Sequence, residues 1–162
     1  MGKVLAVCIS ERKGTQKRNV GSAVFVKDWG IEGDAHAGKW HRQVSLLGYE
    51  RIEAFKMLGA DVENGSFGEN IIVEGYDLKS LPVGTRFVVG DAVLELTQIG
   101  KQCHKHCAIY HKMGDCIMPR EGVFCKVIKG GRVSAGDSFD IIGDVLVEPS
   151  YEIGRASCRE RV

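Results

Sequence analysis

The chain places one cysteine, Cys103, within a cluster of imidazoles and cations, in the run QIGKQCHKHC over residues 98–107. The neighbouring positive charges predict that its thiol ionises more readily than the thiol of a free cysteine. A thiolate attacks sulfur, carries a persulfide or binds a soft metal. Cys103 is therefore the predicted reactive residue, and it is also a predicted metal ligand.

The same segment supplies the soft ligands of an alternative zinc site. Three residues separate Cys103 from the next cysteine, a gap within the range found in zinc pairs. Eight residues separate that cysteine from the next one, without the tight CxxC spacing that a zinc ribbon usually shows. The alternative ligands beside Cys103 are Cys107, Cys116, His104 and His106.

A glycine-bounded segment, GDAHAG over residues 33–38, places a carboxylate and an imidazole two residues apart. Glycines let a ligand approach the backbone closely. Lys39 and Arg42 follow, so the loop carries a local positive charge that suits a phosphate or another anion. His36, Lys39 and Arg42 are therefore candidate cofactor-binding residues. The alternative is a turn in which Asp34 binds nearby backbone amides.

Two further polar segments carry candidate binding residues. The run GSFGEN over residues 65–70 ends in Asn70, whose amide could donate to a ligand, lock a neighbouring loop or bind backbone within a turn. The run MPREG over residues 118–122 places Arg120 after a proline. A planar guanidinium can hold a phosphate or carboxylate in two hydrogen bonds. The alternative for Arg120 is an ion pair with Glu121 or a solvated loop.

These segments need a framework, and the composition predicts a mainly β one. Glycine occurs 21 times and proline 3 times, and the glycines separate short β-branched runs. Residues 49–58 show helical spacing of apolar side chains, and a second short helix is expected near residues 107–113. We therefore expect a closed or nearly closed β-barrel with one or two short helices. The expected strands cover residues 3–9, 22–26, 43–47, 70–73, 86–89, 92–98, 123–128 and 138–142.

Length and charge limit the classes of function. The 162 residues suit one domain, which we place at residues 1–143, followed by a C-terminal tail at 144–162 that is expected to be partly non-native. With 22 basic and 21 acidic residues, the chain gives no electrostatic reason to expect nucleic acid or an anionic membrane as a partner. No apolar run has the length of a membrane span or the pattern of a signal peptide, which predicts a cytoplasmic location.

Four blocks in order resemble the MOSC family, which includes the C-terminal domain of molybdenum cofactor sulfurases and small bacterial proteins. The first is GDAHAG with RQVSLL over residues 42–47, and the second is GSFGENI with VEG over residues 73–75. The third is LPVGTRFVVG over residues 81–90, and the fourth is LTQ at residues 96–98 leading to Cys103. Many members have proline directly before this cysteine, whereas this chain has Gln102.

The resemblance implies a MOSC-type barrel and a function in molybdenum cofactor biosynthesis or sulfuration. By position, Cys103 would carry a persulfide or ligate molybdenum, and His36, Arg42 and Asn70 fall on the matching motifs. The cofactor would be molybdopterin-bound molybdenum. Pyridoxal phosphate would enter only through a partner cysteine desulfurase, because this chain has no domain of that kind. Proteins of molybdenum cofactor biosynthesis are the other expected partners.

Two alternatives remain at the level of sequence. In the first, the barrel is non-catalytic and the cysteine and histidine cluster binds a structural zinc. In the second, the chain is a small molybdoenzyme that reduces N-hydroxylated compounds, as some members of the family do with an electron-donating partner.

Overall fold

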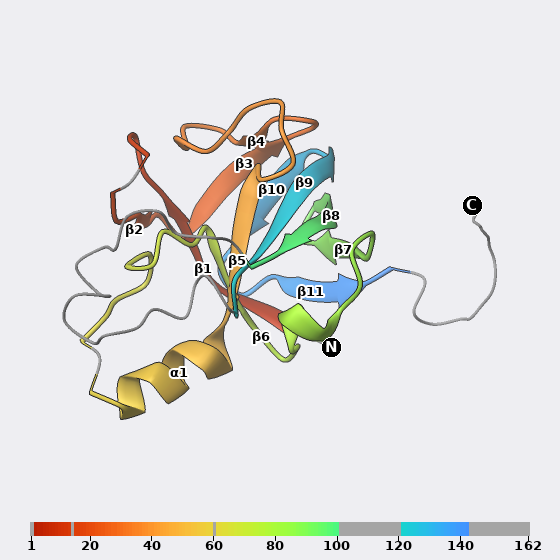
Figure 1. Ribbon diagram of the computed structural model, residues 1–162. Coiled ribbons are helices and arrows are strands. Elements are labelled where there is room, and N and C mark those ends of the chain that lie inside the picture. The colour runs from red at the N-terminus through yellow and green to blue at the C-terminus, as the bar shows by residue number, and fades with distance from the viewer. Residues whose placement is uncertain (1, 14, 60, 101–120, 143–162) are drawn as a thin grey trace.

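A computed structural model describes residues 2–13, 15–59, 61–100 and 121–142 (Figure 1). Short strands with tight connections make up most of this part of the chain. Its elements are β1 (Gly2–Ile9), β2 (Arg18–Asn19), β3 (Ser22–Val26), β4 (Gly30–Ile31), β5 (Val44–Gly48), α1 (Tyr49–Met57), β6 (Ile71–Glu74), a 3-10 turn η1 (Leu78–Ser80), β7 (Arg86–Val89), β8 (Ala92–Ile99), β9 (Val123–Lys129), β10 (Gly131–Ser134) and β11 (Ser138–Ile141).

Seven of these strands close into a barrel, which confirms the predicted fold class. Their order is β11-β7-β8-β9-β5-β6-β1, and β1 pairs again with β11 through Gly2 opposite Phe139. Within this ring β5 and β6 run parallel, and the other neighbours run antiparallel. A second sheet, in the order β10-β3-β4, packs on the barrel. Closure pairs the β1 edge that an open sheet would expose.

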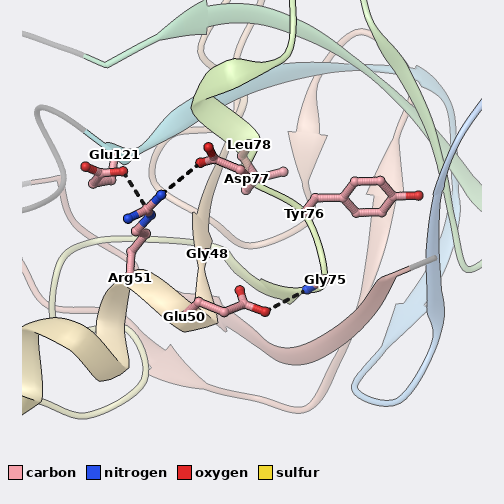
Figure 2. Close-up of a pocket in the computed structure, with 8 residues that line it drawn as sticks. All are labelled: Gly48, Glu50, Arg51, Gly75, Tyr76, Asp77, Leu78 and Glu121. Carbon is pink, nitrogen blue, oxygen red and sulfur yellow. Dashed lines mark hydrogen bonds and ion pairs between the residues drawn. The ribbon is translucent and has the colours of Figure 1, made fainter.

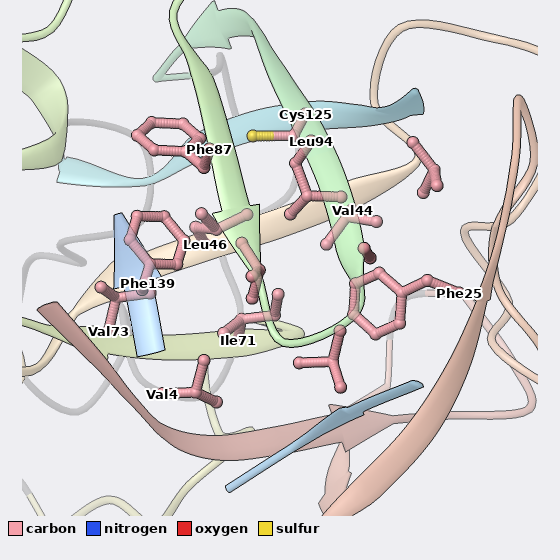
Figure 3. Close-up of a cluster of buried hydrophobic side chains, with 14 of the residues drawn as sticks. Val4, Phe25, Val44, Leu46, Ile71, Val73, Phe87, Leu94, Cys125 and Phe139 are labelled. Carbon is pink, nitrogen blue, oxygen red and sulfur yellow. The ribbon is translucent and has the colours of Figure 1, made fainter. Parts of the chain in front are cut away.

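The strands bury side chains on both faces of one wall of the barrel. Leu46 points into the interior cluster, whereas its neighbour Leu47 belongs to a second cluster outside the barrel. Ile71 and Ile72 divide in the same way. This alternation follows from the two-residue period of a strand. The interior contains Phe87 and Phe139, whose ring centroids lie 4.6 Å apart, and Figure 3 shows part of that cluster.

The outer cluster lies under the helix. In α1 the side chains of Ile52 and Phe55 are each 4 % exposed and face that cluster. Gly59 follows the helix at φ +104°, and its N–H donates to the Lys56 carbonyl at 2.9 Å. The predicted end of the helix is thus confirmed, but Leu58 lies outside the packed face and is 75 % exposed.

The predicted strands match the observed ones within one or two residues, and three strands were not predicted. β2 and β4 contain two residues each, so their sequences carry no measurable period. β10 begins at Gly131, within a glycine pair that predicted only a turn. The turn is confined to Gly130, and Gly131 already pairs with Phe25 of β3.

Candidate functional site

The segment after β1 places a lysine, Lys17, in the interior beside the predicted loop. Its Nζ lies 2.7 Å from Asp34 Oδ1, 3.0 Å from Ser10 Oγ and 3.0 Å from His36 Nδ1. The side chains of both Lys17 and Asp34 are fully buried. A buried charge is tolerated when a counter-charge and hydrogen bonds replace water, and this ion pair meets both conditions.

Asp34 also fixes the backbone around it. Its Oδ1 accepts the Ser10 N–H at 3.1 Å, and its Oδ2 accepts the His36 N–H at 3.2 Å. The local contact with the His36 amide is the one that the sequence offered as the alternative for Asp34, and the contact with Ser10 is long-range. The partner that sequence reasoning missed is Lys17, which lies within a polar run at residues 11–19 that resembles a solvated loop. No spacing rule links Lys17 to Asp34 across 17 residues.

Trp40 connects the candidate residues of this loop. Its Nε1 donates to the His36 carbonyl at 2.8 Å, and its ring stacks on the His36 ring with an interplanar angle of 8°. The Arg42 guanidinium lies 4.7 Å from the centroid of the Trp40 ring and 5.6 Å from that of Phe124. Cation–π contacts of this kind hold a guanidinium in place without using its N–H donors. Lys39 is exposed.

Arg42 retains hydrogen-bonding capacity after these contacts. Its Nε is buried and has no hydrogen-bond partner among the residues that the structure describes. A buried donor without an acceptor costs free energy unless a ligand or another group satisfies it. Arg42 is therefore the residue of this loop whose geometry most favours an anionic ligand.

The loop is attached to the end of β8, from which the chain continues toward Cys103. His41 Nε2 lies 2.6 Å from Gln98 Oε1, and Thr97 Oγ1 donates to the His41 carbonyl. Gln98 in turn donates to the Gly100 carbonyl at 2.8 Å. These contacts bring two of the sequence blocks, the GDAHAG loop and the LTQ strand end, to one place.

The GSFGEN segment folds around a buried carboxylate. Glu69 is fully buried, and its two oxygens accept the N–H groups of Gly65 and Phe67, each at 3.0 Å. Burial raises the pKa of Glu69 from 4.5 to about 7, although those N–H donors and the charge of Lys17 act in the opposite direction. Glu69 thus organises the loop that packs against Lys17.

The side chain of Asn70, a candidate binding residue, makes its hydrogen bonds inside the protein. It is fully buried, and its Oδ1 accepts the Ser45 N–H at 2.9 Å. Its Nδ2 donates to the Cys8 carbonyl at 2.9 Å. Asn70 therefore joins β1, β5 and β6, which is the locking role that the sequence offered as one alternative for this residue.

The remaining predicted site residues lie outside the described part of the chain. Within that part, Cys8 and Cys125 are buried free thiols. Burial raises the pKa of both thiols, to about 12 for Cys8, so neither resembles a reactive cysteine. The described ranges contain no group of three potential metal-binding side chains. The predictions outside those ranges concern Cys103, His104, His106, Cys107, Cys116, Arg120 and the second helix.

A separate pocket lies beside the start of α1. It has a volume of about 300 Å³ and is lined by residues of β5, α1 and the β6–η1 connection (Figure 2). Among its lining residues, Arg51 bridges Asp77 and Glu121, at 3.4 Å from each carboxylate. None of the residues around Lys17 and Arg42 lines it, so it is distinct from the candidate site.

Most of the part of the chain that forms the barrel and its loops matches a known family. The family model of the MOSC domain matches residues 33–140, which include the GDAHAG loop, the GSFGEN loop and the LTQ strand end. The chain therefore belongs to the MOSC domain family.

In the described ranges, no helix has the length and apolarity needed to cross a membrane.

Individual relatives agree with this assignment. The chain is 25 % identical over 139 residues to YflK, an uncharacterized protein of Bacillus subtilis (strain 168), covering 80 % of this chain and 63 % of YflK. It therefore spans less than two thirds of that relative. The crystal structure of YuaD from Bacillus subtilis superposes with a TM-score of 0.66 at 20 % identity, over 86 % of this chain and 94 % of YuaD.

A second solved structure shows the same fold. YiiM from Geobacillus stearothermophilus superposes with a TM-score of 0.66 at 18 % identity, covering 88 % of this chain and 75 % of YiiM. At these identities the likeness concerns the fold alone.

Proposed function

We propose that this MOSC-domain protein binds the molybdenum cofactor or carries sulfur for it, with Cys103 as metal ligand or persulfide carrier. The observation that supports the proposal most directly is the attachment of the His36–Arg42 loop to the end of β8. Gln98 contacts both His41 and Gly100, and Cys103 follows Gly100 by three residues in the sequence. The candidate anion-binding loop is thus attached where the sequence continues into the cysteine-bearing segment.

The donor set of the described residues fits a phosphate-bearing cofactor. Arg42 has a buried Nε without a partner in the described ranges, and its guanidinium is positioned by Trp40 and Phe124. His36 and the exposed Lys39 lie on the same loop. Arg42, His36 and Lys39 would hold the phosphate or pterin edge, and a bound cofactor would supply a metal centre that accepts a thiolate ligand. Arg120 is proposed as a further anion clamp.

In the carrier role, the chemistry is an exchange between sulfur atoms. The Cys103 thiolate attacks the outer sulfur of a persulfide on a partner cysteine desulfurase. A new S–S bond forms on Cys103, the partner's S–S bond breaks, and the partner's cysteine leaves as a thiolate. The transfer needs no external oxidant or reductant. Pyridoxal phosphate belongs to the partner, and proteins of molybdenum cofactor biosynthesis would receive the sulfur.

The proposal is tested on protein purified from a molybdate-replete host, by elemental mass spectrometry and pterin fluorescence. We expect molybdenum and pterin in the wild type, loss of the metal in Cys103→Ser, and loss of pterin in Arg42→Gln. Arg86→Gln is the matched control, because it removes a surface guanidinium that pairs with Glu95 on the barrel. A second aliquot is incubated with cysteine desulfurase and cysteine, and its mass is measured for one added sulfur atom.

Loss of molybdenum or loss of the added sulfur atom in Cys103→Ser supports the proposal, since both chemistries use that thiol. If the wild type holds no pterin and gains no sulfur, or if Cys103→Ser gains as much as the wild type, the proposal is wrong. Zinc in both proteins, without pterin, would instead support a structural site.

A further inference from the structure

We infer that Lys13 is a specificity-determining residue of the candidate site, where it acts with Arg42 to favour doubly charged oxyanions over singly charged ones. It rests on the proposed function only for the source of the oxyanion, which is either a phosphate ester on a cofactor or a free anion. The charge preference itself follows from three residues, Lys13, Trp40 and Arg42.

The indole of Trp40 carries two cations. Its centroid lies 5.1 Å from Lys13 Nζ and 4.7 Å from the guanidinium carbon of Arg42, and its Nε1 is anchored on the His36 carbonyl. Because both distances end at one centroid, the two charges are at most about 10 Å apart, which is the screening length in 0.1 M salt. An anion beside this ring therefore interacts with both cations.

Neither cation has a counter-charge from the protein. In the part of the chain that the structure describes, no carboxylate pairs with Lys13 or Arg42, whereas the surface guanidinium of Arg86 pairs with Glu95 at 2.9 Å. An exposed lysine without a partner is ordinary, since water solvates it. The Nε of Arg42 is different, because it is buried without an acceptor. An oxyanion that binds this donor enters the field of Lys13 as well.

The segment that carries Lys13 is attached to the GDAHAG loop on both sides of this residue. Before it, the Ser10 N–H donates to Asp34 Oδ1 at 3.1 Å, and the Ser10 carbonyl accepts the Ala35 N–H at 2.8 Å. After it, Lys17 Nζ binds the same Asp34 oxygen at 2.7 Å. The buried ion pair between Lys17 and Asp34 thus keeps the exposed Lys13 beside that loop.

The two cations contribute differently to recognition. Arg42 offers directed N–H donors, which bind a singly or a doubly charged oxyanion alike. Lys13 is exposed and contributes mainly its charge. Because the energy of attraction is proportional to the product of the charges, Lys13 attracts a dianion twice as strongly as a monoanion at the same place. The factor that it adds to the affinity for a dianion is therefore the square of the factor for a monoanion.

The test compares two tetrahedral oxyanions at pH 7, the doubly charged sulfate and the singly charged methanesulfonate, at constant ionic strength. The full chain is first dialysed at high salt, which releases bound anions. Binding is followed by the fluorescence of Trp40 in a Trp29→Phe background, because the chain has two tryptophans. We expect sulfate to bind more tightly than methanesulfonate, and Arg42→Gln to lose the response to both.

The decisive variant is Lys13→Met. It should weaken sulfate about tenfold and methanesulfonate only about threefold. Lys13→Arg keeps the charge and should keep the preference for sulfate. The matched control is Lys56→Met, which removes a positive charge paired with Glu53 on α1 and should leave both affinities unchanged. No response of the wild type to sulfate, equal losses for both anions in Lys13→Met, or an equal effect of Lys56→Met would overturn the inference.

The pterin content of Lys13→Met, purified from the molybdate-replete host, identifies the source of the oxyanion. Lower pterin together with weaker sulfate binding assigns it to a cofactor phosphate, and unchanged pterin with weaker sulfate binding assigns it to a free anion. The two proposals fail separately. A protein that prefers sulfate through Lys13 but holds neither pterin nor a persulfide refutes the proposed function alone. A pterin-loaded protein without that preference refutes only the inference about Lys13.

Discussion

The raised pKa of the buried Glu69 carboxyl leads us to expect that the protein becomes less stable as the pH rises. Its carboxyl is fully buried, and burial raises its pKa from 4.5 to about 7. Between these values the folded protein keeps the proton and the unfolded chain releases it. Stability from this group is therefore complete below pH 4.5 and is lost as the pH rises through 7. We expect a loss of about 2 to 3 kcal/mol in the free energy of unfolding between pH 5 and pH 8.

The matched comparison is Glu69→Gln, which has the same shape but does not ionise. Urea unfolding of both proteins at pH 5, 6, 7 and 8 gives the difference in their free energies of unfolding, and groups common to both cancel. The free energy of unfolding of the wild type, relative to that of Glu69→Gln, should fall by about 2 to 3 kcal/mol as the pH rises. A difference that stays constant over this range, or that moves in favour of the wild type, would refute the reasoning that Glu69 is protonated in the folded protein.

Three further predictions concern the same region. Gly65 and Gly68 both have positive φ, but only at Gly65 would a Cβ overlap the Lys17 carbonyl. Gly68→Ala should therefore lower the free energy of unfolding by about 1–2 kcal/mol, and Gly65→Ala should lower it far more, as urea unfolding would show. Lys17→Met leaves the Asp34 charge buried and should cost about 3–5 kcal/mol of stability, against less than about 1 kcal/mol for Lys79→Met, whose ion pair with Glu121 is at the surface. Iodoacetamide should leave Cys8 and Cys125 unmodified in the native protein and modify both in urea, as peptide mass spectrometry would show; modification before unfolding would contradict their burial.

Much of the barrel was predictable from the sequence because its strands obey a short period and end at glycines. The run of residues 43–47 is buried at every position, so it lacks alternation, but its valine and two leucines still predicted a strand. Residues 30–31 and 18–19 form strands only because longer partners are already in place, and a dipeptide cannot encode that.

The candidate site was predictable only in part. His36 stood out because it lies within a glycine-bounded segment, and Arg42 because it adds a guanidinium four residues after that segment. Lys17 did not, since its burial depends on contacts with Asp34 and Ser10 that the fold creates. Trp40 was also missed, because a tryptophan in a loop does not reveal from sequence that it will support two neighbouring polar side chains.

The pairing of β1 with β11 also sets an order of events during synthesis. Gly2 and Lys3 pair with Phe139 and Ser138, so the strand made first waits for the last strand that the structure describes. Until residues 138–141 leave the ribosome, one edge of β1 has no partner and the barrel stays open beside its apolar interior. The long separation between paired residues makes closure entropically costly and slow. A nascent chain stalled before residue 138 would therefore expose this edge to other chains.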